Sequence, residues 1–165
     1  MKKILTLISA CVFGSFLSTS LYAANHPVTG EKLSADQTFT YWHGDEHSSQ
    51  DPQIVEDTYG ANIVRDLFEG LLSQDAEGNL VPGVAESWSA NDAKDVYTFN
   101  LRKNAKWSNG DPVTAHDFVY GWQRAVDPAT ASPYSWYMDI MSIKNGGEAI
   151  NGDVQPSELG VKAID

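Results

Sequence analysis

The chain has 165 residues, of which 42% are hydrophobic and 20% charged, and its formal net charge is −11. This length suits one domain or part of a larger one, and the composition excludes a disordered chain. The negative charge disfavours nucleic acids and anionic lipid surfaces as partners, so we expect small molecules or proteins instead.

The first 23 residues have the pattern of a secretory signal. Lys2 and Lys3 precede an uncharged apolar run from Ile4 to about Leu21, and Ala23 supplies the small residue of a cleavage site. We expect cleavage after Ala23, which leaves a net charge of about −13 (−11 − 2). An uncleaved membrane anchor is the alternative, but serines and threonines interrupt the run.

The single cysteine, Cys11, lies within this signal. The mature chain therefore has no disulfide and no thiol chemistry. An exported protein without disulfides is typical of the bacterial periplasm and must be held together by its core.

The first part of the mature chain predicts a strand and a helix. Residues 38–42 (TFTYW) are rich in β-prone side chains and predict a strand. Asp57 or Thr58 can cap the next helix, whose apolar positions continue to residue 72. Residues 75–79 predict a turn.

The second part predicts further strands and a capped helix. Residues 97–101 alternate in polarity and predict a half-buried strand with its aromatic side inward. Residues 106–107 predict a short return strand that ends at an Asn-Gly turn. Thr114 and Asp117 form a shortened capping box for a helix that ends at Asp127.

The last residues predict short elements. A helix opens after Ser132, and glycines bound another short helix within residues 146–152. Residues 156–160 predict one tight turn, and residues 161–165 predict the start of a strand.

The sequence motifs that could indicate a catalytic or metal site are weak. His43 and His47 have the spacing of a zinc pair, but the surrounding glycine and serines predict a loop. His116 and Asp117 are adjacent on a helix and point in different directions. No nucleophile elbow or phosphate-binding loop occurs, and neighbouring acids arise by chance among 22 acidic residues. We therefore expect no enzyme, no metal and no cofactor, with a small secreted hydrolase that uses the acidic pairs or the two histidines as the alternative.

Several motifs in order carry a resemblance to a known family. They are RDLFEGLL at 65–72, PGVAESW at 82–88, YTFNLRKNAKWSNG at 97–110, PVTAHDFVYGWQRAVDP at 112–128, SPY at 132–134 and LGVKAID at 159–165. The chain resembles the peptide- and nickel-type extracellular solute-binding proteins of ABC importers, family 5. The resemblance covers nearly the whole mature chain.

The resemblance implies an α/β fold of the periplasmic-binding-protein type, with two class II-like lobes that close around an extended peptide. The chain corresponds to an incomplete N-terminal part with mixed sheet and packed helices. Its expected divisions are a signal peptide at 1–23, the N-terminal segment of the first ligand-binding lobe at 24–68, and a smaller α/β subdomain at 69–165 that is incomplete at its C-terminal end.

The implied role is capture of oligopeptides in the periplasm and delivery to the membrane subunits of an ABC transporter, by a monomer that binds no nucleic acid. A receptor for murein tripeptide or another small solute on the same fold is the alternative. Family members are much longer, so we expect a fragment, a truncated product or the product of a decayed gene. Alone, it should bind peptides weakly or not at all, because the groups that grip both peptide ends lie elsewhere in the family fold.

The resemblance also assigns ligand-binding residues. Glu56, Asp57 and Thr58 follow the Asp-Pro pair at residues 51–52 and would line the peptide groove, as would Tyr134 of the SPY motif. Such a groove reads the peptide backbone and leaves wet space for side chains, so it accepts many sequences.

Overall fold

The computed structural model describes residues 25–26 and 28–164, which fall into two units divided between Trp42 and His43. The predicted signal at 1–23 lies outside the described residues. In the described part of the chain, no helix has both the length and the apolar character needed to cross a membrane.

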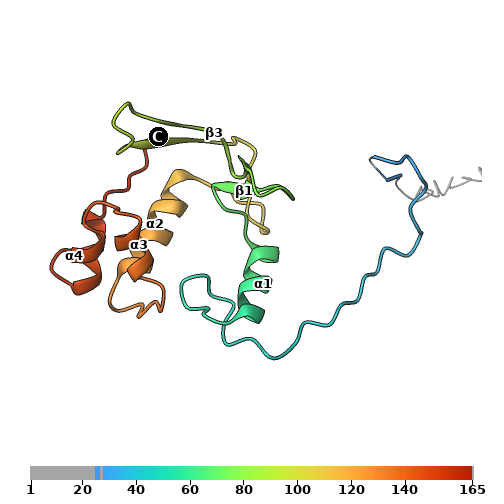
Figure 1. Ribbon diagram of the computed structural model, residues 1–165, viewed down its shortest axis with the longest axis horizontal. Coiled ribbons are helices and arrows are strands. Elements are labelled where there is room, and N and C mark those ends of the chain that lie inside the picture. Colours follow the sequence, from blue (N-terminus) through green and yellow to red (C-terminus); the bar gives the residue numbers. More distant parts are fainter. Residues whose placement is uncertain (1–24, 27, 165) are drawn as a thin grey trace, which may run out of the picture. The chain divides into compact units, whose positions relative to one another are not determined.

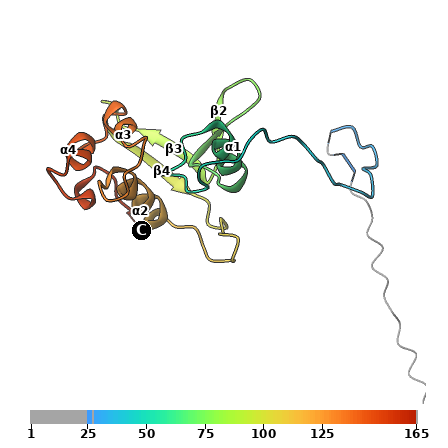
Figure 2. The same ribbon diagram turned by 90° about the horizontal axis from the view of Figure 1, so that it is seen from below.

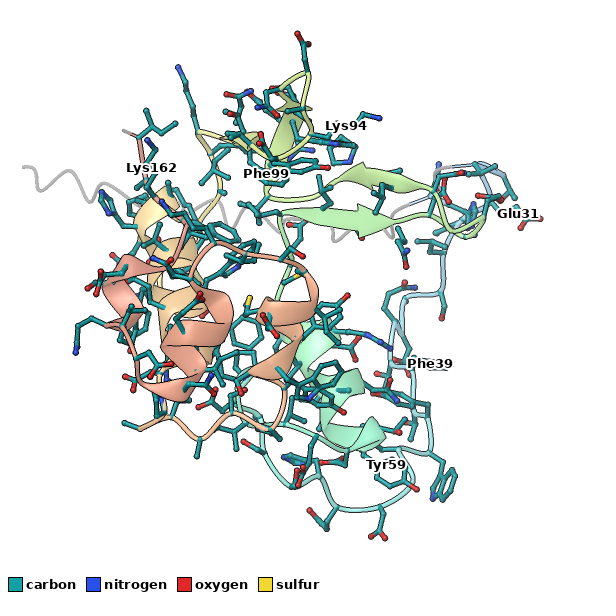
Figure 3. The ribbon with its side chains drawn as sticks, turned by 60° about the vertical axis from the view of Figure 1, so that its left-hand side comes forward. Glu31, Phe39, Tyr59, Lys94, Phe99 and Lys162 are labelled. Atoms are coloured by element: carbon teal, nitrogen blue, oxygen red, sulfur yellow. The ribbon has the colours of Figure 1, made fainter. Side chains whose placement is uncertain are left out.

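The described residues of the first unit form a turn and a long segment without helix or strand. Asn25 and Lys32 make an isolated antiparallel bridge across the turn. The strand predicted at 38–42 is wrong, because these residues belong to no strand. β-prone side chains favour a strand mainly by packing on a half-buried surface, and Phe39 (labelled in Figure 3) and Trp42 are 84% and 86% exposed.

The second unit begins with a loop that leads into α1 (Thr58–Leu67), for which Asp57 is the N-cap as predicted. The helix ends at Leu67, short of the predicted residue 72. The backbone of the following residues is used elsewhere: the carbonyls of Gly70 and Leu71 accept hydrogen bonds from the amides of residues 83–85. The backbone has already left the helical region at Phe68 (φ −124°, ψ 138°), and Leu72 begins a strand, so the helix cannot continue to residue 72.

Two antiparallel hairpins follow α1, and each is a two-stranded sheet. β1 (Leu72–Gln74) pairs with β2 (Leu80–Pro82) across the predicted turn at 75–79, where the Asp75 carboxylate accepts a hydrogen bond from the Asn79 amide at 2.8 Å. Figure 2 shows β3 (Ala85–Ala90) beside β4 (Tyr97–Leu101), with which it pairs. The register of this pair shifts between Ala85 and Ser87.

The strand predicted at 97–101 is confirmed as β4. Phe99 and Leu101 are half-buried as predicted, but Tyr97 is 57% exposed, so the inward aromatic side does not extend to the first residue. β3 is not indicated by its sequence, because AESWSA lacks a regular apolar alternation. The return strand predicted at 106–107 is a single bridge between Lys106 and Pro112.

Helix α2 (Ala115–Val126) has the predicted boundaries. At its start, the Asp117 carboxylate accepts hydrogen bonds from the Thr114 amide at 2.6 Å and the Thr114 hydroxyl at 2.8 Å. The helix stops at Val126, with Asp127 as the C-cap before a proline. A residue before proline is driven out of helical backbone, which explains this end.

Three short elements complete the unit: α3 (Trp136–Ile140), α4 (Gly146–Asn151) and η1 (Pro156–Glu158), which confirm the predicted short helices and tight turn. The strand predicted from 161 is wrong for the described residues 161–164, which belong to no strand. The Val161 amide instead donates to the Leu159 carbonyl at 2.7 Å, so this N–H is used in a tight turn and not in pairing with another strand.

The core lies where α2, α4 and η1 meet, and Figure 1 shows α2, α3 and α4 side by side. At its centre are Val126, Ala149 and Leu159, with exposed fractions of 1%, 0% and 3%. Partly buried apolar side chains surround them: Trp122, Met138, Ile143, Ile150, Val154 and Val161. Burial of these side chains supplies the main stabilisation of the helical part.

Replacement of Val126 by Ala should destabilise the chain by about 2 kcal/mol, because two buried methyl groups are lost and a small cavity remains. Urea unfolding followed by tryptophan fluorescence measures this change. The matched control is Val96→Ala, since Val96 is 57% exposed; its cost should stay below about 0.5 kcal/mol. Equal effects of the two variants would contradict this description of the core.

Candidate functional site

A tightly bonded loop precedes α1 and carries the segment assigned to the ligand. Asp51 orders this loop. Its amide donates to Ser49 Oγ and its carboxylate accepts from the Gln53 amide, both at 3.0 Å. Its carbonyl accepts from the amides of Ile54 and Val55, at 3.0 and 2.9 Å. These bonds hold the backbone of residues 49–55 in one conformation.

Asp57 closes the same loop at its other end. One carboxylate oxygen accepts from the Gly60 amide at 2.7 Å, and the other accepts from the Ser48 amide at 2.9 Å and from the Ser48 hydroxyl. The Ser48 hydroxyl, helped by the amides of Gly60 and Ser48, holds the pKa of Asp57 well below its usual range. Both oxygens of Asp57 are therefore used within the protein, and Thr58 follows as the exposed first residue of α1.

Glu56 differs from both of its neighbours. Val55 before it is 9% exposed, and Asp57 after it is the bonded, extended cap, whereas Glu56 is exposed. Within the described residues, neither the main-chain N–H nor the carbonyl of Glu56 makes a hydrogen bond. Main-chain groups are strong donors and acceptors that require partners. The loop therefore presents these two groups to water or to an extended ligand.

Arg124, in the last turn of α2, joins this loop to the helical core. Its Nη1 donates to Asp51 Oδ1 at 2.7 Å and to Gln53 Oε1 at 2.6 Å. Its Nη2 donates to Asp51 Oδ2 at 2.6 Å, which completes a two-pronged ion pair. The guanidinium lowers the pKa of Asp51, and the carboxylate raises that of Arg124.

A groove of about 490 Å³ lies beside this ion pair. The loop contributes Pro52 and Gln53, and α2 contributes Gly121 together with its neighbours. Gly121 leaves space there, because a Cβ at that position would meet only Gln53 Nε2, at 3.7 Å. The remaining lining is mostly aromatic or apolar: Trp122, Ala125, Ser132, Tyr134, Trp136, Tyr137 and Met138.

Three aromatic rings form one side of this groove. Tyr134 and Trp136 lie 5.9 Å apart between ring centroids and are tilted by 49°, and Trp136 meets Tyr137 edge-on at the same distance. The Trp136 indole N–H donates to the Pro133 carbonyl at 3.0 Å, which fixes its ring. All three rings are about half exposed. Such rings offer apolar area with polar edges, which suits contact with a ligand that is both apolar and polar.

The structure brings only some of the predicted site residues together. Tyr134 lines the groove, and so do the residues that begin the ligand-facing loop. Residues 56–58 are adjacent to one another but do not line that groove. The sequence did not indicate the contacts of Arg124 with Asp51 and Gln53. These pairs are 73 and 71 residues apart, and no local sequence pattern predicts a contact over such a separation.

Other features of the described chain carry less chemistry. Residues 43–47 form a loop as predicted, and the His43 ring packs against Tyr59 (labelled in Figure 3) at 5.9 Å. Within the described residues, no group of three or more His, Cys, Asp or Glu could hold a metal ion. A second groove, of about 720 Å³, lies between the end of α1 and the β1–β2 hairpin, with Arg65 and Leu80 among its lining residues.

Comparisons with known proteins show the family of this chain. Residues 79–165 match the model of "Bacterial extracellular solute-binding proteins, family 5 Middle". The chain is 48% identical to the Salmonella typhimurium periplasmic oligopeptide-binding protein OppA over 160 residues, which cover 97% of this chain and 29% of that protein. It is 43% identical to the Escherichia coli periplasmic murein peptide-binding protein MppA over 165 residues, 100% of this chain and 30% of that protein.

A solved structure of a family member also matches this chain. Haemophilus influenzae OppA in complex with RPPGFSPFR matches with a TM-score of 0.73 and 50% identity, over 74% of this chain and 24% of that one. The chain thus spans less than a third of the length of the relatives it matches.

The charge of Asp57 should stabilise the folded chain at neutral pH. Because the folded-state pKa of Asp57 is lowered, this contribution is present above the ordinary carboxyl pKa and is lost as pH falls through the folded value. Asp57→Asn keeps an N-cap acceptor but removes the charge. We expect a lower urea midpoint at neutral pH, and a difference from wild type that narrows as pH falls from about 5 to about 2.

The matched control is Asp66→Asn, an exposed position on the same helix. Its difference from wild type should stay small throughout this pH series. A difference for Asp57→Asn that does not vary with pH would contradict the assigned role of the charge.

Proposed function

The chain belongs to family 5 of the bacterial extracellular solute-binding proteins, and from this premise we propose that it takes part in the capture of oligopeptides for import. The family and the α/β fold class of the periplasmic-binding-protein type agree with the expectation from the sequence. Two relatives carry peptide binding in their names, the oligopeptide-binding protein OppA and the murein peptide-binding protein MppA.

The main chain of the exposed residue Glu56, which makes no hydrogen bond within the described residues, is the observation that supports this proposal. An extended peptide is recognised through its own N–H and C=O groups when it pairs with an exposed backbone segment. The groups of Glu56 have no hydrogen bond within the described residues, while Asp51 and Asp57 fix the backbone on both sides. A rigid segment loses little conformational entropy when it binds a ligand.

The proposed ligand contacts are Glu56, Asp57, Thr58 and Tyr134. Asp57 would act through its main-chain N–H, since its carbonyl accepts from the Ala61 amide and its carboxylate is bonded to Ser48 and Gly60. The exposed carboxylate of Glu56 is the one available to a cationic peptide group. Tyr134, 52% exposed, would contact the peptide from the aromatic side of the groove.

The rest of the proposed role follows the family. The site would be in the periplasm, reached by an N-terminal signal, and loaded peptide would pass to the membrane subunits of an ABC transporter. The protein would act as a monomer, bind no nucleic acid and leave its ligand chemically unchanged. Residues 24–68 would belong to the first ligand-binding lobe and residues 69–165 to a smaller subdomain.

A murein-peptide receptor is the second candidate. It is supported by the 43% identity to Escherichia coli MppA over 165 residues. Both candidates would use the same backbone segment, so peptide composition distinguishes them. Preference for a murein tripeptide over tri-alanine would favour the second candidate.

We expect the 165-residue chain to bind tri-alanine weakly. A few backbone hydrogen bonds in water contribute about 1 kcal/mol each, and association costs several kcal/mol. A dissociation constant of about 1 mM or weaker follows. Titration of the isotope-labelled chain, followed by amide chemical shifts, should show changes at residues 56–58 and at Tyr134.

Two variants at one position test the role of the main chain. Glu56→Pro removes the N–H, which donates no hydrogen bond within the described residues, and should weaken tri-alanine binding about fivefold. Glu56→Ala removes the carboxylate but keeps the N–H, and should bind tri-alanine more tightly than Glu56→Pro. Chemical shifts that stay unchanged at residues 56–58, or equal binding by the two variants, would contradict the proposal.

A further inference from the structure

We propose that Arg124 is a positioning residue of the peptide site: its guanidinium holds Asp51 and Gln53, and thereby fixes the loop that presents Glu56 relative to the groove that contains Tyr134. This inference rests on the proposed function. Arg124 itself belongs to α2 and is not among the residues assigned to the ligand.

The contact reaches far along the chain. Arg124 Nη1 bonds to Asp51 Oδ1 and Gln53 Oε1, at 2.7 and 2.6 Å, across 73 and 71 residues. Nη2 bonds to Asp51 Oδ2 at 2.6 Å. Three hydrogen bonds from one planar group therefore fix both the position and the orientation of the turn.

Hydrogen bonds connect Asp51 directly to the residues that precede Glu56. Its carboxylate accepts from the Gln53 amide, and its carbonyl accepts from the amides of Ile54 and Val55. Val55, 9% exposed, immediately precedes Glu56. A shift of Asp51 must therefore break these bonds or move the backbone that presents Glu56.

The same contact sets the distance across the groove. Pro52 and Gln53 line it from the loop, and Gly121 and Trp122 line it from α2. Arg124 comes from the same α2 and bonds to the residues on either side of Pro52. The chain that follows α2 carries Tyr134 into this lining. Arg124 thus links the two proposed ligand-contacting segments.

An arginine is required by this geometry. A lysine keeps the positive charge, but its ammonium is a point charge without the planar fork that meets two carboxylate oxygens and an amide oxygen together. The Arg124 and Asp51 side chains are 30% and 33% exposed, so the pair contributes modestly to stability. Loss of the bidentate arginine contact should therefore increase the mobility of the loop without unfolding the chain.

Amide hydrogen exchange on the full chain tests this inference. In Arg124→Lys and Arg124→Gln, the amides of Gln53, Ile54 and Val55 should exchange about tenfold faster than in wild type, while the amides of β4 keep their rates. The matched control is Arg102→Gln, which removes another long-range arginine contact, from Nε to the Gly83 carbonyl at 2.7 Å. That variant should leave the rates at residues 53–55 unchanged.

Unchanged exchange at residues 53–55 in the Arg124 variants would overturn the inference, and so would equal acceleration in the loop and in β4. Titration with tri-alanine adds a second readout. Both Arg124 variants should bind about fivefold more weakly than wild type, and Arg102→Gln should bind as wild type does. Wild-type affinity in either Arg124 variant would also overturn the inference. If the wild-type chain does not respond to tri-alanine, the proposed peptide contacts of this 165-residue chain fail, and the exchange rates alone decide whether Arg124 holds the loop.

Discussion

The carboxylate of Asp51 is the point at which the loop before α1 and the helical core are joined. It accepts the Gln53 amide within its own loop and both prongs of the Arg124 guanidinium from α2. A two-pronged arginine pair fixes direction as well as distance. Asp51 bonds to the amide of Gln53, which lines the aromatic groove, and to the amide of Val55, which precedes Glu56. The groove and the backbone at Glu56 therefore both depend on this contact.

Three acids in the loop have different tasks, and their surroundings explain the difference. Asp51 is bonded to an arginine, and Asp57 is bonded to a serine and a helix N-terminus, so their charges serve the structure. Glu56 is exposed and its main chain is unpaired within the described residues. The strong net negative charge therefore says little about ligand preference by itself. The acids must first be divided into those that are bonded within the chain and those that are not.

Features that depend on neighbouring residues could be predicted from the sequence. The Asp57 cap, the start of α2 at Thr114 and the turn at residues 75–79 each rest on bonds within a few residues, and all three are present. The end of α1 could not be predicted, because the residues after it pair with distant positions: Leu72 pairs with Pro82, and residues 70–71 bond to residues 83–85. The Arg124 contact was missed for the same reason. The ligand assignments at residues 56–58 and Tyr134 came from the family resemblance and remain proposals.

Gly121 has a consequence for how such a groove can vary between relatives. A Cβ at this position would meet only one flexible amide group, 3.7 Å away. The backbone of α2 can thus accept a methyl group there without rearrangement of its core contacts. A glycine-to-alanine change would narrow the groove while the cap, the ion pair and the buried valine stay the same. The groove lining at Gly121 can therefore diverge faster among relatives than the Arg124–Asp51 contact that fixes the loop.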